Sequence, residues 1–411
     1  MSDLVTPFRG ERYAAREKLS SLIAPPYDVI DTAERARFAA LDEHNIVHVM
    51  LPEAPSVRPA DDRYRIAAEL LGSWRERGIL TRDREPALYV LAQDFTLPTG
   101  ERYTRRGVLA AVMAEGYEPG RVRPHERTHA GPKADRLALL RATATNIESI
   151  FLIAPDHDRA LANAVATVAQ GTPAATAELN GVGIRLWIVR DVSRFPFPDA
   201  PLYIADGHHR YETASAYARE NPAADRVLSL IVSAREPGLV VLPTHRVIFG
   251  AGREIDPMLP RWRHWFDVQP VPAGVDPIRH LATLGRNQTA CLVADRSRIV
   301  ALLMRPGADV DRVPGLAHSV AVRDLDVARV ESLVVQEILG ASSSTPTVRY
   351  TADANEALQL VQQGSAAVAV LLNPTKVEQV FAFADAGDVM PPKSTYFVPK
   401  VPSGLVLRPP D

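Results

Sequence analysis

One short stretch of the chain gathers most of the residue types that could do chemistry. Asp206, Gly207, His208, His209 and Arg210 follow one another directly. Histidine and arginine donate hydrogen bonds to anions, and arginine can hold a phosphate with two parallel bonds. Asp206 beside them is a candidate metal ligand or proton acceptor. This composition predicts an anion site, with Gly207 and Arg210 cradling phosphates and Asp206, His208 and His209 as catalytic candidates.

The flanking residues indicate how this cluster is presented. Leu202 to Ala205 is a short apolar run, which is typical of a buried strand. Tyr211 to Glu220 has the alanine content and the apolar spacing of a helix. The Gly207 turn would then lead into a helix N-terminus, whose N–H groups and positive dipole end attract anions. We expect Arg210 at this turn and outside the core.

A second dense polar stretch covers Arg121–Arg141 and leads into a helix predicted from Asp135 to Thr145. It mixes acid, base, hydroxyl and guanidinium groups within a dozen residues, which favours a site over a solvated loop. Glu126 is a candidate general base or, like Asp206, a candidate Mg²⁺ ligand. Further candidates for contacts with phosphate or substrate are His125, Thr128, Lys133 and Arg136.

Other polar residues stand where the backbone is predicted to be rigid. Tyr27 and Asp28 follow two prolines, which block a helix and fix the loop, so they are candidates to hold a substrate amine or hydroxyl. His245 and Arg246 come at the end of a predicted strand, where site residues are often presented. Lys393 and Ser394 lie in a proline-flanked polar stretch near the C-terminus.

The lysines are few enough to be informative. The chain has five lysines against 42 arginines. If arginine has replaced lysine wherever charge alone matters, the remaining lysines mark places that need a compact, titratable amine. They are Lys18, Lys133, Lys376, Lys393 and Lys400.

Composition excludes several classes of protein. With 46% hydrophobic and 23% charged residues, the chain is typical of a soluble globular protein. A net charge of −2 gives no electrostatic case for nucleic acid, and no apolar run approaches a membrane span. The single Cys291 excludes a disulfide framework and a cysteine zinc site, and fits the cytoplasm. Whether the protein is a homo-oligomer stays open.

The order of predicted elements favours an α+β fold with mixed, largely antiparallel sheets and flanking helices. We expect two domains, a motif-rich one over residues 1–250 with the phosphate site, and a second one over residues 251–411 that contributes Lys376 and Lys393. Helices are expected over Thr32–Ala40, Asp61–Arg77, Leu325–Leu339 and Ala354–Gln363. Strands are expected over Asn45–Leu51, Ala87–Phe95, Tyr103–Ala114, Glu148–Ala154, Gly183–Asp191, Arg226–Ser233, Val240–Leu242, Thr289–Ala294, Ile299–Arg305 and Ala366–Leu372.

Seven motifs spread over nearly the whole chain together resemble the bacterial and archaeal "domain of unknown function ten-fifteen" family. They are APPYDVI, PHERT, PKADRL, IADGHHRYETA, LPTHR, LLNPTKVEQV and MPPKSTYF. The DGHHR segment is also similar to the Gly-x-His-Arg motif of the ParB/sulfiredoxin-like superfamily, with matches at Gly207, His209, Arg210 and Ala214. That second resemblance implies a ParB/sulfiredoxin-like core, a segment that binds nucleotide phosphates, and kinship with kinases of free serine.

Residues and resemblance together favour a phosphotransferase that uses ADP or ATP with Mg²⁺ on a small hydroxyl substrate such as L-serine. Two alternatives stay open: a nucleotide-binding regulator without turnover, and a hydrolase of phosphorylated metabolites that uses the same anion site. Because dense polar clusters are costly to keep unless they serve one site, we expect Asp206, Glu126 and Lys393 to line a single cleft.

Overall fold

The computed structural model describes residues 3–410 apart from 55–58, 60, 61, 119, 127, 129, 251–253, 318, 341–345, 389 and 392. The chain forms two compact units. Unit 1 comprises residues 1–124, 128–239 and 399–411, and unit 2 comprises residues 125–127 and 240–398. The last residues of the chain therefore return to unit 1.

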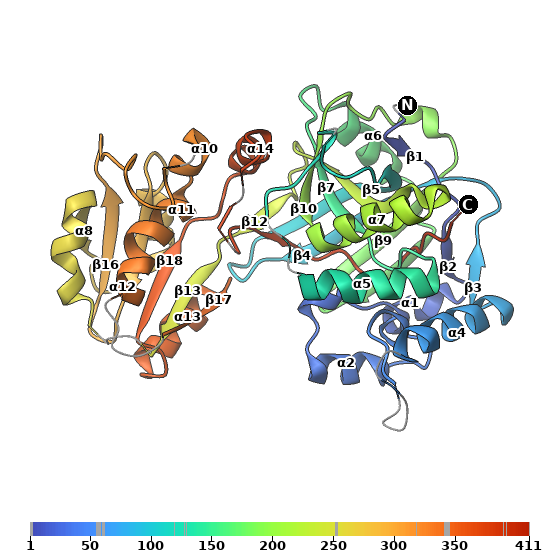
Figure 1. The fold of residues 1–411 in the computed structure, drawn as a ribbon, viewed down its shortest axis with the longest axis horizontal. Helices are drawn as coiled ribbons and strands as arrows, with labels where there is room; N and C mark the ends of the chain where they lie inside the picture. Colours follow the sequence, from blue (N-terminus) through green and yellow to red (C-terminus); the bar gives the residue numbers. More distant parts are fainter. Residues whose placement is uncertain are drawn as a thin grey trace. The chain divides into compact units, whose positions relative to one another are not determined.

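Unit 1 is built on a nine-stranded sheet (Figure 1). Its strands, in spatial order, are β6 (Val122–Arg123), β10 (Leu202–Asp206), β7 (Ile150–Ala154), β11 (Arg226–Ser233), β5 (Arg102–Met113), β4 (Leu88–Thr96), β9 (Val182–Val189) and β8 (Ala175–Leu179), with β1 (Val5–Thr6) beside β5. Only β6 with β10 and β7 with β11 pair in parallel in this sheet, among the residues described. A separate antiparallel pair joins β2 (Glu11–Tyr13) to β3 (Leu80–Arg82).

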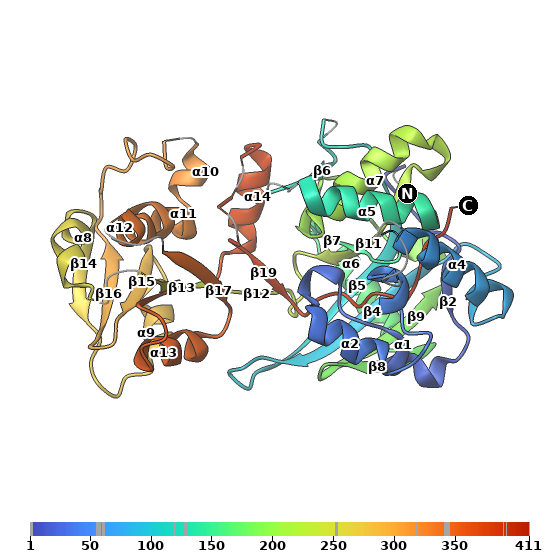
Figure 2. The same cartoon turned by 60° about the horizontal axis from the view of Figure 1, so that its bottom comes forward.

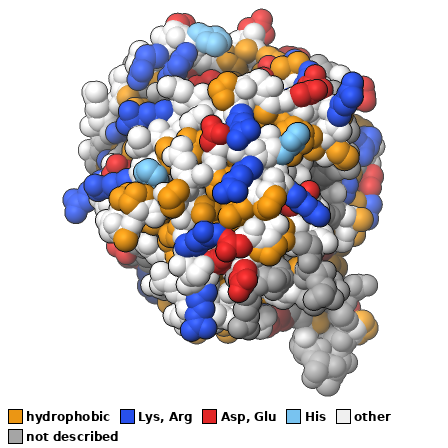
Figure 3. All heavy atoms as spheres, turned by 90° about the vertical axis from the view of Figure 1, so that its left-hand side faces the viewer, with side chains coloured by type: hydrophobic (Ala, Val, Ile, Leu, Met, Phe, Trp, Pro, Cys, Tyr) orange, Lys and Arg blue, Asp and Glu red, His pale blue; other side chains and the backbone are white. Residues whose placement is uncertain are grey.

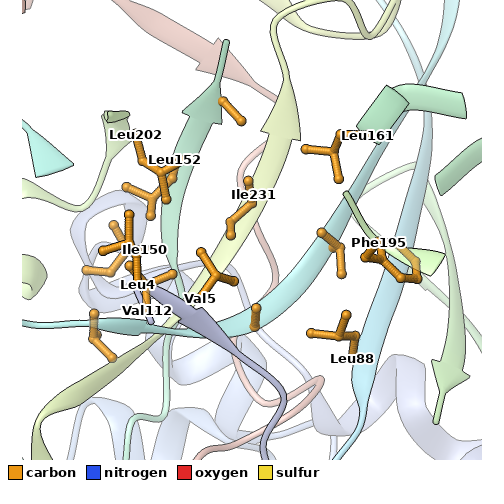
Figure 4. Close-up of a cluster of buried hydrophobic side chains, with 14 of the residues drawn as sticks. Leu4, Val5, Leu88, Val112, Ile150, Leu152, Leu161, Phe195, Leu202 and Ile231 are labelled. Atoms are coloured by element: carbon orange, nitrogen blue, oxygen red, sulfur yellow. The ribbon is translucent and has the colours of Figure 1, made fainter. Parts of the chain in front are cut away.

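The core of unit 1 explains why these segments become strands. Alternate residues of a strand face the same side of a sheet. On β4 these are Leu88, Val90 and Ala92, and all three belong to one buried apolar cluster (Figure 4). Each fully buried Leu, Val or Ile side chain stabilises the fold by roughly 1.5–3 kcal/mol. The cluster therefore fixes which face of each strand points inward and so aligns the strand ends.

Helices complete unit 1. They are α1 (Leu19–Leu22), α2 (Thr32–Ala39), α3 (Val47–Met50), α4 (Asp62–Glu76), α5 (Ala130–Thr143), α6 (Ala160–Val168) and α7 (His208–Glu220). Tyr211 and Ala214 of α7 are buried in the same apolar cluster as the β4 residues, and so are Leu161 and Val165 of α6. The packing of Tyr211 therefore anchors α7 one turn from its N-terminus.

The expected strand at Asn45–Leu51 is wrong, because the segment forms α3 instead. The apolar run is typical of a strand, but the Asn45 side chain makes hydrogen bonds to backbone groups that a neighbouring strand would otherwise satisfy. Its amide donates to the carbonyl oxygens of Ser21 at 2.7 Å and Ile23 at 3.2 Å, while its Oδ1 accepts from the N–H of Val47 at 2.9 Å. A local turn held by an asparagine thus outcompetes the strand that the residue types favour.

Two helices begin earlier than the sequence predicts, and both differences matter for the site. α7 starts at His208 and not at Tyr211, so both histidines and Arg210 are helical. α5 starts at Ala130 and not at Asp135, so Lys133 lies within the helix and not in a loop before it. The candidate residues therefore have the fixed spacing of helix turns.

Unit 2 holds an antiparallel six-stranded sheet. In spatial order its strands are β14 (Phe266–Pro270), β16 (Ile299–Met304), β15 (Ala290–Ala294), β18 (Val368–Leu372), β13 (His245–Phe249) and β17 (Thr347–Thr351); a separate pair joins β12 (Val240–Leu242) to β19 (Tyr396–Val398). Its helices are α8 (Leu259–Trp265), α9 (Pro277–Leu284), α10 (Val320–Arg323), α11 (Asp326–Val330), α12 (Gln336–Gly340), α13 (Ala354–Gln362) and α14 (Val377–Asp385). The helix expected over Leu325–Leu339 is present, with one π-helical segment at Glu331–Val335 between α11 and α12.

The predicted fold class is confirmed: both units combine largely antiparallel sheets with flanking helices. In the part of the chain that is described, no helix is both long and apolar enough to cross a membrane. On the face drawn in Figure 3, lysine and arginine side chains are interspersed with aspartate and glutamate.

Candidate functional site

The turn between β10 and α7 brings Gly207 and Arg210 into direct contact. Gly207 has a φ of +94°, in the left-handed region that favours glycine. A Cβ atom placed there would lie 3.2 Å from both Cζ and Nε of Arg210. Gly207 therefore provides both the backbone conformation of the turn and the space for the guanidinium beside the start of α7.

Arg210 is buried, with 8% of its surface exposed, which corrects the expectation that it lies outside the core. Its Nη1 donates to the carbonyl oxygen of Ser149, and its Nη2 donates to Oδ2 of Asp206 at 3.1 Å. Nε is buried and has no hydrogen-bond partner among the described residues. A desolvated donor without a partner is costly, so a ligand or water molecule that reached this atom would remove that cost.

Asp206 is enclosed by positive charge. While Oδ2 accepts from Arg210, Oδ1 accepts from Nζ of Lys400 at 3.1 Å. Burial alone would raise the pKa of Asp206, but Lys400, Arg210 and His208 together lower it well below its usual value. A carboxylate with a depressed pKa is a weak base. Both of its oxygens are also engaged with cations, so the geometry does not fit Asp206 as general base or as a Mg²⁺ ligand.

Arg105 on β5 is the most deeply buried cation near this carboxylate. Its side chain is 1% exposed and its Cζ lies 4.5 Å from the centre of the Phe151 ring. Nη2 donates to Oε1 of Gln93, whose Nε2 donates to the Lys400 carbonyl oxygen at 2.9 Å. Burial lowers the pKa of Arg105 to about 9, and the charge of Asp206 opposes that shift. Nε and Nη1 of Arg105 have no hydrogen-bond partner in the described part of the chain.

Helices α5 and α7 lie side by side and run parallel (Figures 1 and 2). Near their starts, Lys133 donates to Glu212 at 2.8 Å, and near their ends Arg141 donates to Glu220 at 2.9 Å. Both pairs are separated by 79 positions, which is the signature of two helices in parallel register. Their N-termini, and the positive ends of both dipoles, are therefore adjacent.

The part of the second polar stretch from Thr128 onward thus meets α7 within unit 1. Thr128 also donates to Glu212, at 2.7 Å, so the polar segment before α5 is tied to the second turn of α7. Of the two histidines in the first turn of α7, His208 is buried and its charge acts on Asp206, whereas His209 is half-buried.

Tyr27 and Asp28 lie beside the same group of charges. The Tyr27 N–H donates to Oε1 of Glu148 at 2.9 Å, and the guanidinium of Arg136 lies 4.4 Å from the centre of the Tyr27 ring. Burial, with the charge of Asp28 adding to it, raises the pKa of Tyr27 to about 12, while Arg210 and Arg136 oppose the shift. Asp28 is exposed, and its carboxylate accepts no hydrogen bond from a described residue. It is therefore accessible to a substrate.

Glu148 contacts both the Tyr27 backbone and the Arg136 side chain. It is buried, and its Oε2 lies 3.7 Å from Nη1 of Arg136. Burial raises the pKa of Glu148, and the charges of Arg210 and Arg136 oppose that shift. Arg136 itself is buried and donates to the carbonyl oxygen of Met50 at 2.8 Å, so it positions the Tyr27 loop and is not free to follow a ligand.

The remaining sequence candidates belong to unit 2. His125 is buried, and its Nε2 lies 3.1 Å from Oγ1 of Thr395; the neighbouring Glu126 is half-buried. Lys393 is exposed at a φ of +56°, and Ser394 donates to the carbonyl oxygen of Pro391 at 2.6 Å. Their convergence with Asp206 stays a prediction.

His245 and Arg246 are core residues of β13. Nδ1 of His245 accepts from the N–H of Leu372 at 3.2 Å, and burial, followed by the charge of Arg246, lowers the pKa of this histidine to about 4. Arg246 is 1% exposed and its Nε lies 3.2 Å from Oε2 of Glu331. These contacts hold the six-stranded sheet to the π-helical segment, and a binding role for the two residues stays a prediction.

Four residues of unit 1 that the sequence did not single out as site candidates belong to this arrangement: Arg105, Glu148, Glu212 and Lys400. Lys400 carried a signal, because it is one of only five lysines. Arg105 and Glu148 had none, since a charged residue within or beside a strand normally faces solvent. In the described ranges, no group of three or more histidine, cysteine, aspartate or glutamate side chains is arranged to hold a metal ion.

Comparison with solved structures finds distant likenesses. A free serine kinase in complex with AMP shares 14% identity at a TM-score of 0.36, over 71% of this chain and 87% of that one. A conserved hypothetical protein from Pyrococcus furiosus shares 15% sequence identity at a TM-score of 0.34, over 72% of this chain and 93% of that one. SbnI from Staphylococcus aureus, with a C-terminal truncation, shares 11% sequence identity at a TM-score of 0.37, over 71% of this chain and 84% of that one. No curated protein matches the chain.

The family comparison is decisive where the structural likenesses are weak. The model of the family described as "Protein of unknown function (DUF1015)" matches residues 5–328, which is well over half of the chain and includes the β10–α7 turn. This is the family that the seven sequence motifs resemble. The protein therefore belongs to the DUF1015 family.

Proposed function

We propose that the protein is a nucleotide-dependent phosphotransferase that acts on the hydroxyl group of a small substrate such as L-serine. The observation that carries this proposal is the set of buried arginine donors without partners at the start of α7, namely Nε of Arg210 and Nε and Nη1 of Arg105. Desolvated guanidinium groups whose donors lack partners are suited to a multiply charged anion. The resemblance of the DGHHR segment to a superfamily that binds nucleotide phosphates supports the same assignment.

The phosphates would bind at the N-terminus of α7, where the first-turn N–H groups have no partner within the helix. Lys400, Arg210 and Arg105 supply positive charge around Asp206, and the charges of Glu148 and Glu236 also act on the two arginines. In this arrangement Asp206 orients the lysine and the arginine and does not take part in proton transfer. A phosphate bound at this helix start would interact with these cations.

Asp28 is the better candidate for general base. It is exposed in a short 3-10 helix, Tyr27–Val29, that follows two prolines, and it lies close enough to Arg210 for its charge to raise the pKa of that arginine. The substrate oxygen would attack the terminal phosphorus, and the bond from that phosphorus to the bridging oxygen of the nucleotide would break. The hydroxyl proton would pass to the Asp28 carboxylate, and the nucleotide would leave with one phosphate fewer.

Mg²⁺ fits this site only as the counter-ion of the nucleotide. Magnesium is usually held by one or two carboxylates together with substrate phosphates. Because both oxygens of Asp206 accept from cations, the exposed carboxylate of Asp28 would meet a nucleotide-bound ion, and a role of Glu126 as Mg²⁺ ligand stays a prediction from the sequence. The ion would supply charge neutralisation during transfer.

A pairwise screen tests the proposal. The purified protein is incubated with Mg²⁺, with ATP or ADP, and with single members of a panel of small hydroxyl compounds that includes L-serine, and products are identified by mass spectrometry. We expect a phosphorylated hydroxyl compound in equal amount to the shortened nucleotide. Nucleotide binding by calorimetry without any product would instead support a regulator, and release of inorganic phosphate from phosphorylated metabolites would support a hydrolase.

A further inference from the structure

A cavity in unit 1 lies along the groove between α5 and α7, and its lining does not include Asp206, Arg210 or Lys400. Its volume is about 490 Å³, within the range of small-molecule pockets. Leu137, Ala134 and Ala216 form apolar walls, and Lys133, Glu212 and Thr213 add polar groups. This mixture of flat apolar surface and a few placed polar groups is typical of a site for an organic ligand.

Glu212 is the polar centre of this cavity. Its Oε2 accepts from Lys133 at 2.8 Å and from Thr128 at 2.7 Å. Its Oε1 has only a long contact of 3.5 Å with the Tyr117 hydroxyl, so this oxygen keeps most of its capacity to accept hydrogen bonds. Two donors therefore orient the carboxylate through Oε2, and Oε1 is available apart from its long contact with Tyr117.

Thr213 gives independent support for a ligand here. It lines the cavity and is 4% exposed, and its Oγ1 has no hydrogen-bond partner among the residues described. The hydroxyl is shielded, and Thr213 also borders a smaller pocket lined by Arg136 and Arg210, so rotation of its side chain would bring the hydroxyl to a ligand in the groove.

The spacing along α7 relates this cavity to the phosphate site. Glu212 lies four residues after His208, which corresponds to about 6 Å along a helix axis. A ribose is joined directly to the first phosphate of a nucleotide, so the two parts of one ligand would span this distance. In dinucleotide sites, a carboxylate accepts hydrogen bonds from the ribose hydroxyls.

We propose that the groove between α5 and α7 holds the nucleoside part of the nucleotide, with Glu212 accepting from the ribose hydroxyls and Leu137, Ala134 and Ala216 contacting the base. The inference rests on the proposed function, since it assumes that phosphates bind at the start of α7. It adds a nucleoside site with a named ribose ligand, and it predicts that ADP binds much more tightly than pyrophosphate.

The test compares three probes by calorimetry: ADP, 2′,3′-dideoxy-ADP and inorganic pyrophosphate. Glu212→Gln keeps the size of the side chain but removes its charge. We expect this substitution to weaken the binding of ADP about 10-fold or more, as for the loss of a hydrogen bond to a charged group. The affinity for pyrophosphate should change little. Dideoxy-ADP should bind the wild type about as weakly as ADP binds the variant. Glu220→Gln on the same helix, whose partner Arg141 lies outside the cavity, is the matched control and should bind all three probes like the wild type.

A second variant keeps the test valid if Glu212→Gln unfolds. Ala216→Phe places an aromatic ring in the cavity from a helical position. It should weaken the binding of ADP and leave the affinity for pyrophosphate unchanged. If both variants weaken the binding of ADP and of pyrophosphate equally, or if neither variant weakens the binding of ADP, the groove does not hold the nucleoside. If pyrophosphate and ADP both fail to bind the wild type, the phosphate site itself is wrong, which is a failure of the proposed function and not of this groove alone.

Discussion

Single residues decide what the anion site can do. Arg210 and Asp206 have the residue types of a phosphate ligand and of a general base or metal ligand, but burial gives them additional structural roles. The Arg210 guanidinium donates hydrogen bonds to the Ser149 carbonyl oxygen and to Asp206. The Asp206 carboxylate in turn accepts from both Arg210 and Lys400. Truncating Arg210 would leave a buried carboxylate with one cation fewer, so its loss would destabilise the fold as well as weaken binding.

Arg105→Met tests the donors that have no partner. Methionine has a similar length, and replacing a poorly satisfied buried charge by an apolar side chain is often neutral or stabilising. We therefore expect unchanged or higher stability in urea, together with a loss of affinity for ADP of about 10-fold or more. Arg185→Met on β9 removes an arginine that pairs with Asp94, and serves as control. Unaltered ADP affinity in Arg105→Met would remove this residue from the phosphate site.

Asp206→Asn tests the buried charge network through its pH dependence. Because the folded pKa of Asp206 lies below its unfolded value, its contribution to stability is present above about pH 4 and is lost as the pH falls toward the folded pKa. We expect the wild type to lose stability between about pH 5 and pH 2 more steeply than Asp206→Asn. At pH 7 the variant should be less stable by about 3–5 kcal/mol, the usual cost of breaking a buried pair. Urea titrations at several pH values measure both effects, and parallel pH profiles would refute the assignment.

At the scale of elements, the site depends on a strand, a glycine and two parallel helices. The strand β10, the Gly207 turn and the helix after it were predictable, because apolar runs, turn residues and helical spacing are local signals. The start of α5 was missed, because the polar stretch around Gly131 and Pro132 resembles a loop, although proline is tolerated in the first turn of a helix. The parallel register of α5 and α7 arises from pairs 79 residues apart, which no local pattern encodes.

Gly207→Ala tests the turn. The substitution imposes the cost of a left-handed residue with a Cβ atom, roughly 1–2 kcal/mol, and also pushes the Cβ atom against the Arg210 guanidinium. Gly78→Ala is the matched control, because Gly78 has a φ of +71° and nothing within 4 Å of the added atom. Both variants should lose stability by thermal denaturation, and only Gly207→Ala should also lose ADP affinity. Equal losses of affinity would show that the contact with Arg210 is irrelevant to binding.

For the whole molecule, the main surprise is the path of the chain. Residues 399–411 return to unit 1, where Lys400 reaches Asp206 across 194 positions. The same segment pairs with the N-terminal part of the unit, since the Glu11 N–H donates to the Leu407 carbonyl oxygen at 2.9 Å. The rarity of lysine pointed to Lys400, but only the folded chain reveals its partner. Buried charges such as Arg105 and Glu148 were unpredictable for the same reason.

Removing residues 399–411 should therefore damage unit 1 although these residues end the chain. The deletion removes Lys400 and the pairing with Glu11, so we expect a lower midpoint in thermal denaturation and no measurable ADP binding. Lys400→Met separates the two effects, because it keeps the pairing and removes only the cation. It should weaken ADP with a smaller change in stability. A truncated protein as stable as the wild type would contradict the role of this segment.

The most direct test of the central claim measures rate and affinity in the same variant. Single-turnover transfer from nucleotide to L-serine is followed by mass spectrometry, and nucleotide affinity by calorimetry, for the wild type, Asp28→Asn and Glu126→Gln. Loss of a general base typically lowers the rate about 100- to 10,000-fold, whereas ground-state binding changes little. We predict that Asp28→Asn loses transfer on this scale and keeps its nucleotide affinity. Transfer at the wild-type rate in Asp28→Asn, with the loss appearing in Glu126→Gln instead, would contradict the assignment of the base, and a wild type that transfers phosphate to no hydroxyl compound would contradict the kinase itself.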